Sequence, residues 1–148
     1  MCYHAGSDPG KVGENFMQIL RASEDYLETM LMMQQQHGYI RSIDIADHLG
    51  VTKPSVSYAT KRLRENGFIT MDHSGFITLT DSGMEIADRI YSRHKMLTDF
   101  FTAIGVSPEI ARTDACKVEH DISEETFKAM SRYNEILKET QNKAAAES

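Results

Sequence analysis

Two short amphipathic segments separated by a tight turn stand out in the first half of the sequence. Apolar residues at helical spacing predict a first helix over residues 42–49, begun by Ser42. Gly50-Val51-Thr52 forms a tight connection, and the Thr52 hydroxyl is suited to cap a second helix over residues 53–66. Pro54 falls in the first turn of that helix, where its missing N–H costs little. The sequence therefore predicts a helix-turn-helix.

Two strand-like runs follow the second helix. Residues 68–71 and 76–79 are rich in Phe, Ile and Thr, and the polar segment 72–75 between them predicts the turn of a β-hairpin. The order helix, tight turn, helix, β-hairpin is typical of a winged helix-turn-helix, a fold that binds DNA. The plainer alternative is a pair of ordinary core helices with a solvated basic face.

The charge pattern favours the DNA-binding alternative. A net charge of −6 argues against nucleic-acid binding by the whole surface, but residues 53–64 hold four basic residues and no acidic one. Hydroxyl, amine and guanidinium groups on such a helix are partners for phosphates and base edges. The residues that we expect to contact DNA are Lys53, Ser55, Ser57, Tyr58, Lys61 and Arg62 on the helix and His73 at the hairpin tip.

Helices are expected on both sides of this motif. The preceding helix ends near His37-Gly38, and the pattern allows it to start at about Asn15 or at Ser23. Three helices should follow the hairpin, over residues 80–103, 107–120 and 123–140. The fold class is thus mainly α with a small β-hairpin. Its expected parts are a flexible arm (1–14), a winged helix-turn-helix domain (15–83), a helical domain (84–140) and a frayed tail (141–148).

Composition narrows the setting in which such a protein works. With 41% hydrophobic and 26% charged residues, the chain has the composition of a folded protein rather than of a disordered one. No apolar run approaches the length of a membrane span, and no secretory signal precedes the domain, so a cytoplasmic location is expected. Cys2 and Cys116 lie far apart in the sequence, so a disulfide framework is not expected and each thiol is interpreted alone.

Residue types that bind metals occur at helical spacing in three parts of the chain. Cys116, Glu119 and His120 are spaced to share one face of a helix, and His94 falls on the apolar stripe of the long helix before it. Asp25 and Glu28 form another i, i+3 pair on the first helix. Taken separately, these residues are as well explained by a chance cysteine, a satisfied core histidine and a solvated acidic face. They form one metal site only if the helices converge.

From Ser23 to about Met130 the chain resembles the diphtheria toxin repressor family of metal-dependent transcriptional regulators, and most closely its shorter branch, the manganese transport regulators. The stretches that carry the resemblance are residues 24–28 (EDYLE), 43–46 (IDIA), 54–57 (PSVS), 79–83 (LTDSG), 93–94 (RH) and 116–123 (CKVEHDIS). The resemblance implies a winged-helix DNA-binding domain, then a helical metal-binding and dimerisation domain, without the barrel domain that longer members carry.

The resemblance also implies a metal site. The ligand positions of the manganese branch fall on Asp25, Glu28, His94, Cys116, Glu119 and His120. Cys116 departs from this branch, which usually has Glu there, and agrees with the iron-responsive branch. Asp25 departs from the iron-responsive branch, which has Met. Thr98 stands where the ancillary site of that branch has a Glu, so a complete ancillary site of that kind is not expected.

We therefore expect a homodimeric repressor of metal-uptake genes that binds a palindromic operator in double-stranded DNA and is activated by Mn²⁺ or Fe²⁺. Zn²⁺ and Co²⁺ are further ions that a thiolate and imidazoles can bind. One alternative is a winged-helix regulator that senses a small molecule without metal. A metalloenzyme is the other, although the sequence offers no base and nucleophile outside the ligand set, so no enzymatic activity is expected.

Overall fold

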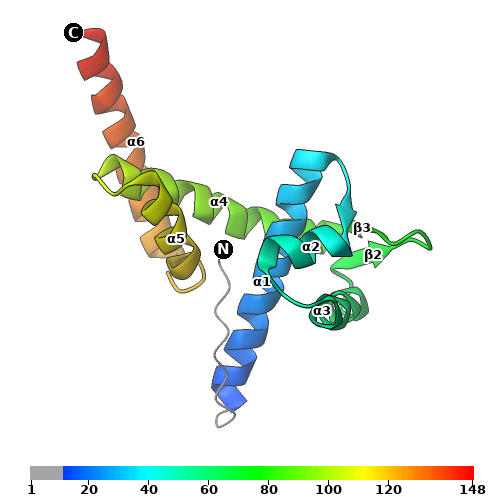
Figure 1. Ribbon diagram of the computed structural model, residues 1–148. Coiled ribbons are helices and arrows are strands. Elements are labelled where there is room, and N and C mark those ends of the chain that lie inside the picture. Colours follow the sequence, from blue (N-terminus) through cyan, green and yellow to red (C-terminus); the bar gives the residue numbers. More distant parts are fainter. Residues whose placement is uncertain (1–11) are drawn as a thin grey trace. The chain divides into compact units, whose positions relative to one another are not determined.

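The structure is a computed structural model that describes residues 12–148, with side chains from residue 20. It divides into two compact units, one of residues up to Tyr91 and one of Ser92–Ser148. The elements of the first unit are the helices α1 (Val12–His37), α2 (Ser42–Leu49) and α3 (Lys53–Glu65) and the strands β1 (Ile40–Arg41), β2 (Ile69–Met71) and β3 (Phe76–Leu79) (Figure 1). Helix α4 (Asp81–Ala103) begins in the first unit and continues into the second, which also contains α5 (Pro108–Val118) and α6 (Glu124–Ala146).

The helix-turn-helix has the local contacts that its sequence predicts. Gly50 adopts a left-handed conformation with φ 66° and ends α2. The Thr52 hydroxyl accepts a hydrogen bond from the backbone N–H of Ser55, which caps α3, and Pro54 lies in the first turn. Val56, Thr60 and Leu63 are buried, so one face of α3 packs inward and the opposite face is free to meet a partner.

A three-stranded antiparallel sheet forms the wing, in the order β1-β3-β2. The turn between β2 and β3 is closed by the Asp72 carboxylate, which accepts hydrogen bonds from the backbone N–H groups of Ser74 and Phe76. Strand β1 is an addition to the predicted hairpin. It has two residues, Ile40 and Arg41, and pairs with Ile77 and Phe76 of β3. Two residues are too few to show an alternating pattern in the sequence.

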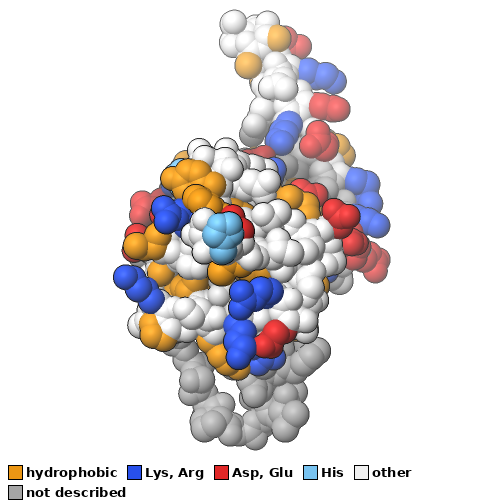
Figure 2. Space-filling view, turned by 90° about the vertical axis from the view of Figure 1, so that its right-hand side faces the viewer, with side chains coloured by type: hydrophobic (Ala, Val, Ile, Leu, Met, Phe, Trp, Pro, Cys, Tyr) orange, Lys and Arg blue, Asp and Glu red, His pale blue; other side chains and the backbone are white. Residues whose placement is uncertain are grey.

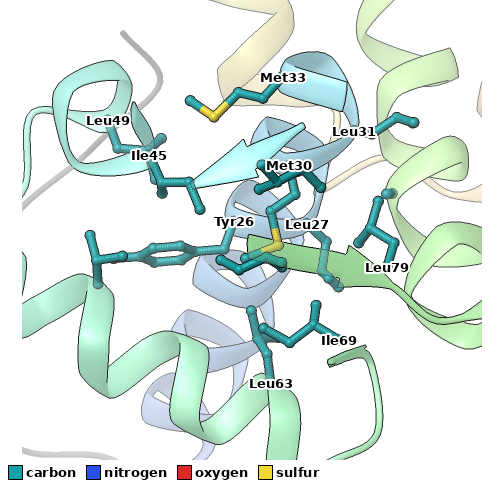
Figure 3. Packing of buried hydrophobic residues seen from close by; sticks show 14 of the residues in the cluster. Tyr26, Leu27, Met30, Leu31, Met33, Ile45, Leu49, Leu63, Ile69 and Leu79 are labelled. Carbon is teal, nitrogen blue, oxygen red and sulfur yellow. The ribbon is translucent and has the colours of Figure 1, made fainter. Parts of the chain in front are cut away.

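The hydrophobic core of the first unit is built around α1. Tyr26, Leu27 and Met30 project from this helix among buried side chains of α2, α3 and the sheet, including Ile45, Leu63 and Ile69 (Figure 3). Leu27 and Met30 are fully buried. Helix α1 begins at Val12, so Ser23 lies inside it and is not its cap; residues 1–11 of the expected arm lie outside the described part.

A tight joint connects β3 to α4. The Thr80 hydroxyl donates to the Gly67 carbonyl at 2.6 Å, and the Ser82 hydroxyl donates to the same oxygen at 3.1 Å. A Cβ added at Gly83 would lie 2.0 Å from the carbonyl oxygen of Phe68, so only a glycine fits there. This joint explains why Thr-Asp-Ser-Gly opens the long helix.

The helices of the second unit differ from the prediction at their ends. Helix α5 ends at Val118, so Glu119 and His120 lie in the turn that follows rather than inside the helix. Helix α6 is capped by Ser123, whose hydroxyl accepts from the Thr126 N–H, and it runs to Ala146, past the expected end at Thr140. Among residues 12–148, no helix combines the length and the apolar character that crossing a membrane requires.

Candidate metal centre and DNA-contact face

Three of the predicted metal ligands come together in the second unit. His94 lies in α4, Cys116 in the last turn of α5 and Glu119 directly after α5. One potential ligand atom from each side chain lies within 4.8 Å of the others. The Glu119 side chain is fully buried and that of His94 is 15% exposed, so the three groups converge in a place largely shielded from solvent.

The closest contacts within this cluster centre on the Nδ1 atom of His94. It lies 2.9 Å from Oε2 of Glu119 and 3.6 Å from Sγ of Cys116. The other oxygen of Glu119, Oε1, lies 3.4 Å from Nε2 of His120, whose side chain is 4% exposed. Because burying a carboxylate is costly unless it is paired or bound to a cation, this arrangement suits a cation site. The His94, Cys116 and Glu119 groups are nitrogen, sulfur and oxygen donors, which divalent transition metals accept.

The structure corrects one expectation about Cys116. Its sulfur is disulfide-bonded, and none of the described residues is a free cysteine. The expectation that each thiol stands alone is therefore wrong for Cys116. Cys2 lies outside the described residues. Cys116 can offer a thiolate to a metal only in the reduced protein.

Asp25 and Glu28 lie in the first unit, one turn apart on α1. Glu28 is 6% exposed, and Asp25 is partly buried. The face that they occupy is therefore not the solvated acidic face of the plainer interpretation. Their share in a metal site stays a prediction.

All the residues predicted to contact DNA have exposed side chains. This holds for the six positions on α3 and for His73 at the hairpin turn. The buried positions of α3 lie between the exposed ones at helical spacing. The guanidinium of Arg62 donates to the Tyr58 hydroxyl at 3.0 Å and lies 5.7 Å from the centre of its ring. Figure 2 views the hairpin side and shows several Lys and Arg side chains standing out from it. The face is thus cationic, and it includes one preordered arginine.

Sequence reasoning assigned no role to Arg93, the residue before His94. Its side chain is buried and contacts the segment that carries Glu119 and His120. The helical pattern of α4 gave no signal for this, because the contacts are made to backbone carbonyls that come 26 and 29 residues later.

Comparisons with known proteins cover both units. Residues 18–75 match the family described as "Iron dependent repressor, N-terminal DNA binding domain", and residues 80–143 match "Iron dependent repressor, metal binding and dimerisation domain". The chain is 36% identical over 127 residues to the transcriptional regulator MntR of Escherichia coli O157:H7, which is 82% of each protein. It is 31% identical over 114 residues to the HTH-type transcriptional regulator MntR of Geobacillus kaustophilus, covering 77% of this chain and 79% of that one.

Solved structures give the same result for the fold. IdeR of T. acidophilum is similar with a TM-score of 0.68 and 26% identity over 74% of this chain. A manganese-dependent transcriptional repressor in complex with manganese is similar with a TM-score of 0.69 and 25% identity over 76% of this chain. The chain spans about half the length of these two structures, 52% of each. The expected resemblance, the mainly α fold and a regulator rather than an enzyme are thereby confirmed. With both of its units matched, the chain belongs to the iron-dependent repressor family.

Proposed function

We propose that this protein is a homodimeric, metal-activated repressor of metal-uptake genes that acts in the cytoplasm. The observation that carries the proposal is the buried convergence of His94, Cys116 and Glu119 in a chain whose α3 exposes a basic, hydroxyl-rich face. The first feature is suited to hold a divalent ion and the second to contact DNA. The chain matches both a DNA-binding and a metal-binding family model, which supports a link between the two activities.

The residues that we propose to hold the ion are the six singled out in the sequence. His94, Glu119 and His120, with the reduced Cys116, would bind it from the second unit, and Asp25 and Glu28 would bind it from α1. When bound, the ion supplies positive charge that offsets the repulsion among these carboxylates. The carboxylates of Asp25, Glu28 and the buried Glu119 make the donor set rich in oxygen, which favours Mn²⁺. The Cys116 thiolate instead favours Fe²⁺, Zn²⁺ or Co²⁺. We propose Mn²⁺ as the activating ion and Fe²⁺ as the nearest alternative, and the manganese regulators among the relatives support this choice.

If all six residues bind one ion, as we propose, the ion gains a way to control DNA binding. Ligands on α1 and ligands on α4 and α5 would fix the DNA-binding unit in one arrangement, so that two copies of α3 in a dimer meet successive major grooves of a palindrome. The ion shifts the equilibrium only as far as it binds that arrangement better than others.

We propose that the dimer forms through the apolar residues after Ile86. Ile104 and Ile110 are 56% and 52% exposed in the single chain, and Phe100, Phe101 and Val106 near them are partly exposed. Exposed isoleucines in one region favour a protein partner, and the matched dimerisation domain covers the same residues. Light scattering should give the mass of a dimer at micromolar concentration, and a monomer with and without metal would contradict this surface.

A metal-titrated DNA-binding assay tests the proposed function. The reduced protein is stripped of metal, and a duplex is selected from random DNA with Mn²⁺ present. Fluorescence anisotropy then follows binding as Mn²⁺, Fe²⁺, Zn²⁺ or Co²⁺ is added. Mn²⁺ should tighten DNA binding at metal concentrations that a cell can supply. If the protein binds DNA equally tightly when a chelator removes the metal, a regulator that senses a small molecule is supported instead. Turnover of a substrate would support a metalloenzyme.

A further inference from the structure

We propose that Arg93 is a positioning residue for the metal site: it holds the turn that carries Glu119 and His120 in the arrangement that presents both side chains to an ion. The proposal deepens the proposed function and rests on it, because it concerns the same ligands. It adds a residue that is itself no ligand, since a guanidinium stays protonated in proteins and has no lone pair to offer a metal.

The contacts of Arg93 converge on one short segment. Its Nη1 atom donates to the carbonyl oxygen of Glu119 at 3.2 Å and to that of Ile122 at 2.8 Å. Its Nη2 atom donates to the Glu124 carboxylate at 2.8 Å. The guanidinium carbon lies 5.2 Å from the centre of the Phe127 ring. The side chain thus joins α4 to the end of α5, to the following turn and to the first turns of α6.

The turn needs such a partner because helix α5 ends too early to order it. Beyond Val118 the backbone carbonyls lose their helical partners, and buried carbonyls require donors from elsewhere. Arg93, which is 6% exposed, supplies them for Glu119 and Ile122, on either side of His120. With both carbonyls held, the backbone at His120 has little freedom to turn its imidazole away.

Arg93 and His94 act on the same residue from adjacent positions of α4. Arg93 binds the main chain of Glu119, and His94 meets its carboxylate through Nδ1 at 2.9 Å. Glu119 is therefore fixed at both its backbone and its side chain before an ion arrives. Ligands fixed in advance by hydrogen bonds to neighbouring groups bind metal more tightly than ligands that must be ordered on binding.

The geometry requires a guanidinium rather than any cation. Two terminal nitrogens reach three acceptors that lie in different directions, and the planar fork keeps them in fixed relation. Lysine has one nitrogen at the end of a flexible stem and can satisfy only part of this set. The ion pair with Glu124 lies at the more exposed end, where the Glu124 side chain is 57% exposed, so we expect the two carbonyl contacts to matter most.

The test compares Arg93→Met, Arg93→Lys and the control Glu124→Gln in the full, reduced chain. Mn²⁺ affinity is measured by calorimetry, thermal unfolding gives stability, and hydrogen exchange of residues 119–123 is followed in metal-free protein. Arg93→Met should bind Mn²⁺ about 10- to 100-fold more weakly, the range seen for residues that orient metal ligands, and exchange faster at 119–123. Arg93→Lys should recover part of the affinity, and Glu124→Gln should stay close to wild type.

Three results would overturn the proposal. One is a folded Arg93→Met protein with wild-type Mn²⁺ affinity and wild-type exchange at 119–123. If Arg93→Met does not fold, Arg93→Lys replaces it, and unchanged affinity and exchange in that variant are the second. A lower unfolding temperature with unchanged affinity would show a purely structural role and also reject the proposal. Failure of the wild type to bind any of the four ions would instead reject the proposed function, while the exchange data still report on the turn.

Discussion

The carboxylate of Glu119 is completely buried, and its Oε2 atom lies 2.9 Å from Nδ1 of His94 on the neighbouring helix α4. A buried carboxylate costs several kcal/mol unless a cation or a hydrogen-bond donor compensates it. This contact joins two residue types that bind metals and does so away from bulk water. It therefore makes Glu119 the residue on which the candidate metal centre depends most.

Replacing Glu119 by Gln should remove most of the metal affinity while leaving the fold intact. The amide keeps the shape of the side chain and can still meet His94, but it removes the negative charge that would attract an ion. We expect Mn²⁺ binding weaker by about 100-fold, or ~2.7 kcal/mol, measured by calorimetry. Glu109→Gln, an exposed change on α5, is the matched control and should bind as wild type. Equal affinity in the two variants would exclude Glu119 as a ligand.

Removing two cations from α3 should weaken DNA binding without changing sequence preference. Lys61 and Arg62 are exposed, and phosphate contacts carry no sequence information. Lys61→Ala with Arg62→Ala should lower affinity for all duplexes alike and reduce the log–log salt slope of the dimer by about four, one for each phosphate that its two protomers no longer neutralise. Lys128→Ala with Lys143→Ala makes the same charge change on α6 and serves as control. Normal binding by the α3 variant would mean that this face of α3 points away from DNA.

Gly83→Ala should destabilise the first unit. The new Cβ would lie 2.0 Å from the Phe68 carbonyl oxygen, which is too close for any atom pair, so β2 or α4 has to shift. Such overpacking costs about 1–3 kcal/mol, which urea unfolding followed by circular dichroism measures. Glu85→Ala changes an exposed site two residues further along α4 and should cost less than about 0.5 kcal/mol. A wild-type stability for Gly83→Ala would show that the joint between β3 and α4 is loose.

Cys116→Glu should move the metal response toward Mn²⁺. The change exchanges a soft sulfur for a carboxylate that can bridge two ions, so oxygen-preferring Mn²⁺ gains and Zn²⁺ loses. We expect more ions bound per chain and activation at lower Mn²⁺ concentration, measured by metal analysis and DNA-binding titration. The contrary outcome is a wild type that responds only to Zn²⁺ or Fe²⁺ and a variant whose response is unchanged. It would show that Asp25 is not the ligand that makes the site prefer Mn²⁺ over those ions.

Much of this architecture follows from local patterns. Thr52 and Pro54 specify where α3 begins, and the spacing of Val56 and Leu63 specifies which side of it is buried. The sequence also places Cys116 and Glu119 at a spacing that lets them share a face, and His94 on the apolar stripe of the long helix. That the three side chains meet depends on how α4 and α5 pack, which the sequence left open.

The features that the sequence did not reveal depend on partners far along the chain. Strand β1 exists because β3 pairs with Ile40 and Arg41, not because those two residues form a pattern. The turn after Val118 is held by Arg93, whose guanidinium donates to the carbonyls of Glu119 and Ile122, 26 and 29 residues later in the chain.

The coupling between metal and DNA is the central claim, and thermodynamic reciprocity tests it most directly. If Mn²⁺ tightens DNA binding by some factor, bound DNA must tighten Mn²⁺ binding by the same factor, commonly about 5- to 150-fold. Calorimetry on the reduced wild-type protein gives the Kd for Mn²⁺ with and without a saturating amount of the selected duplex. We predict a lower Kd with DNA present, by the factor found in the DNA-binding titration. An identical Kd in both conditions would contradict a metal-activated repressor.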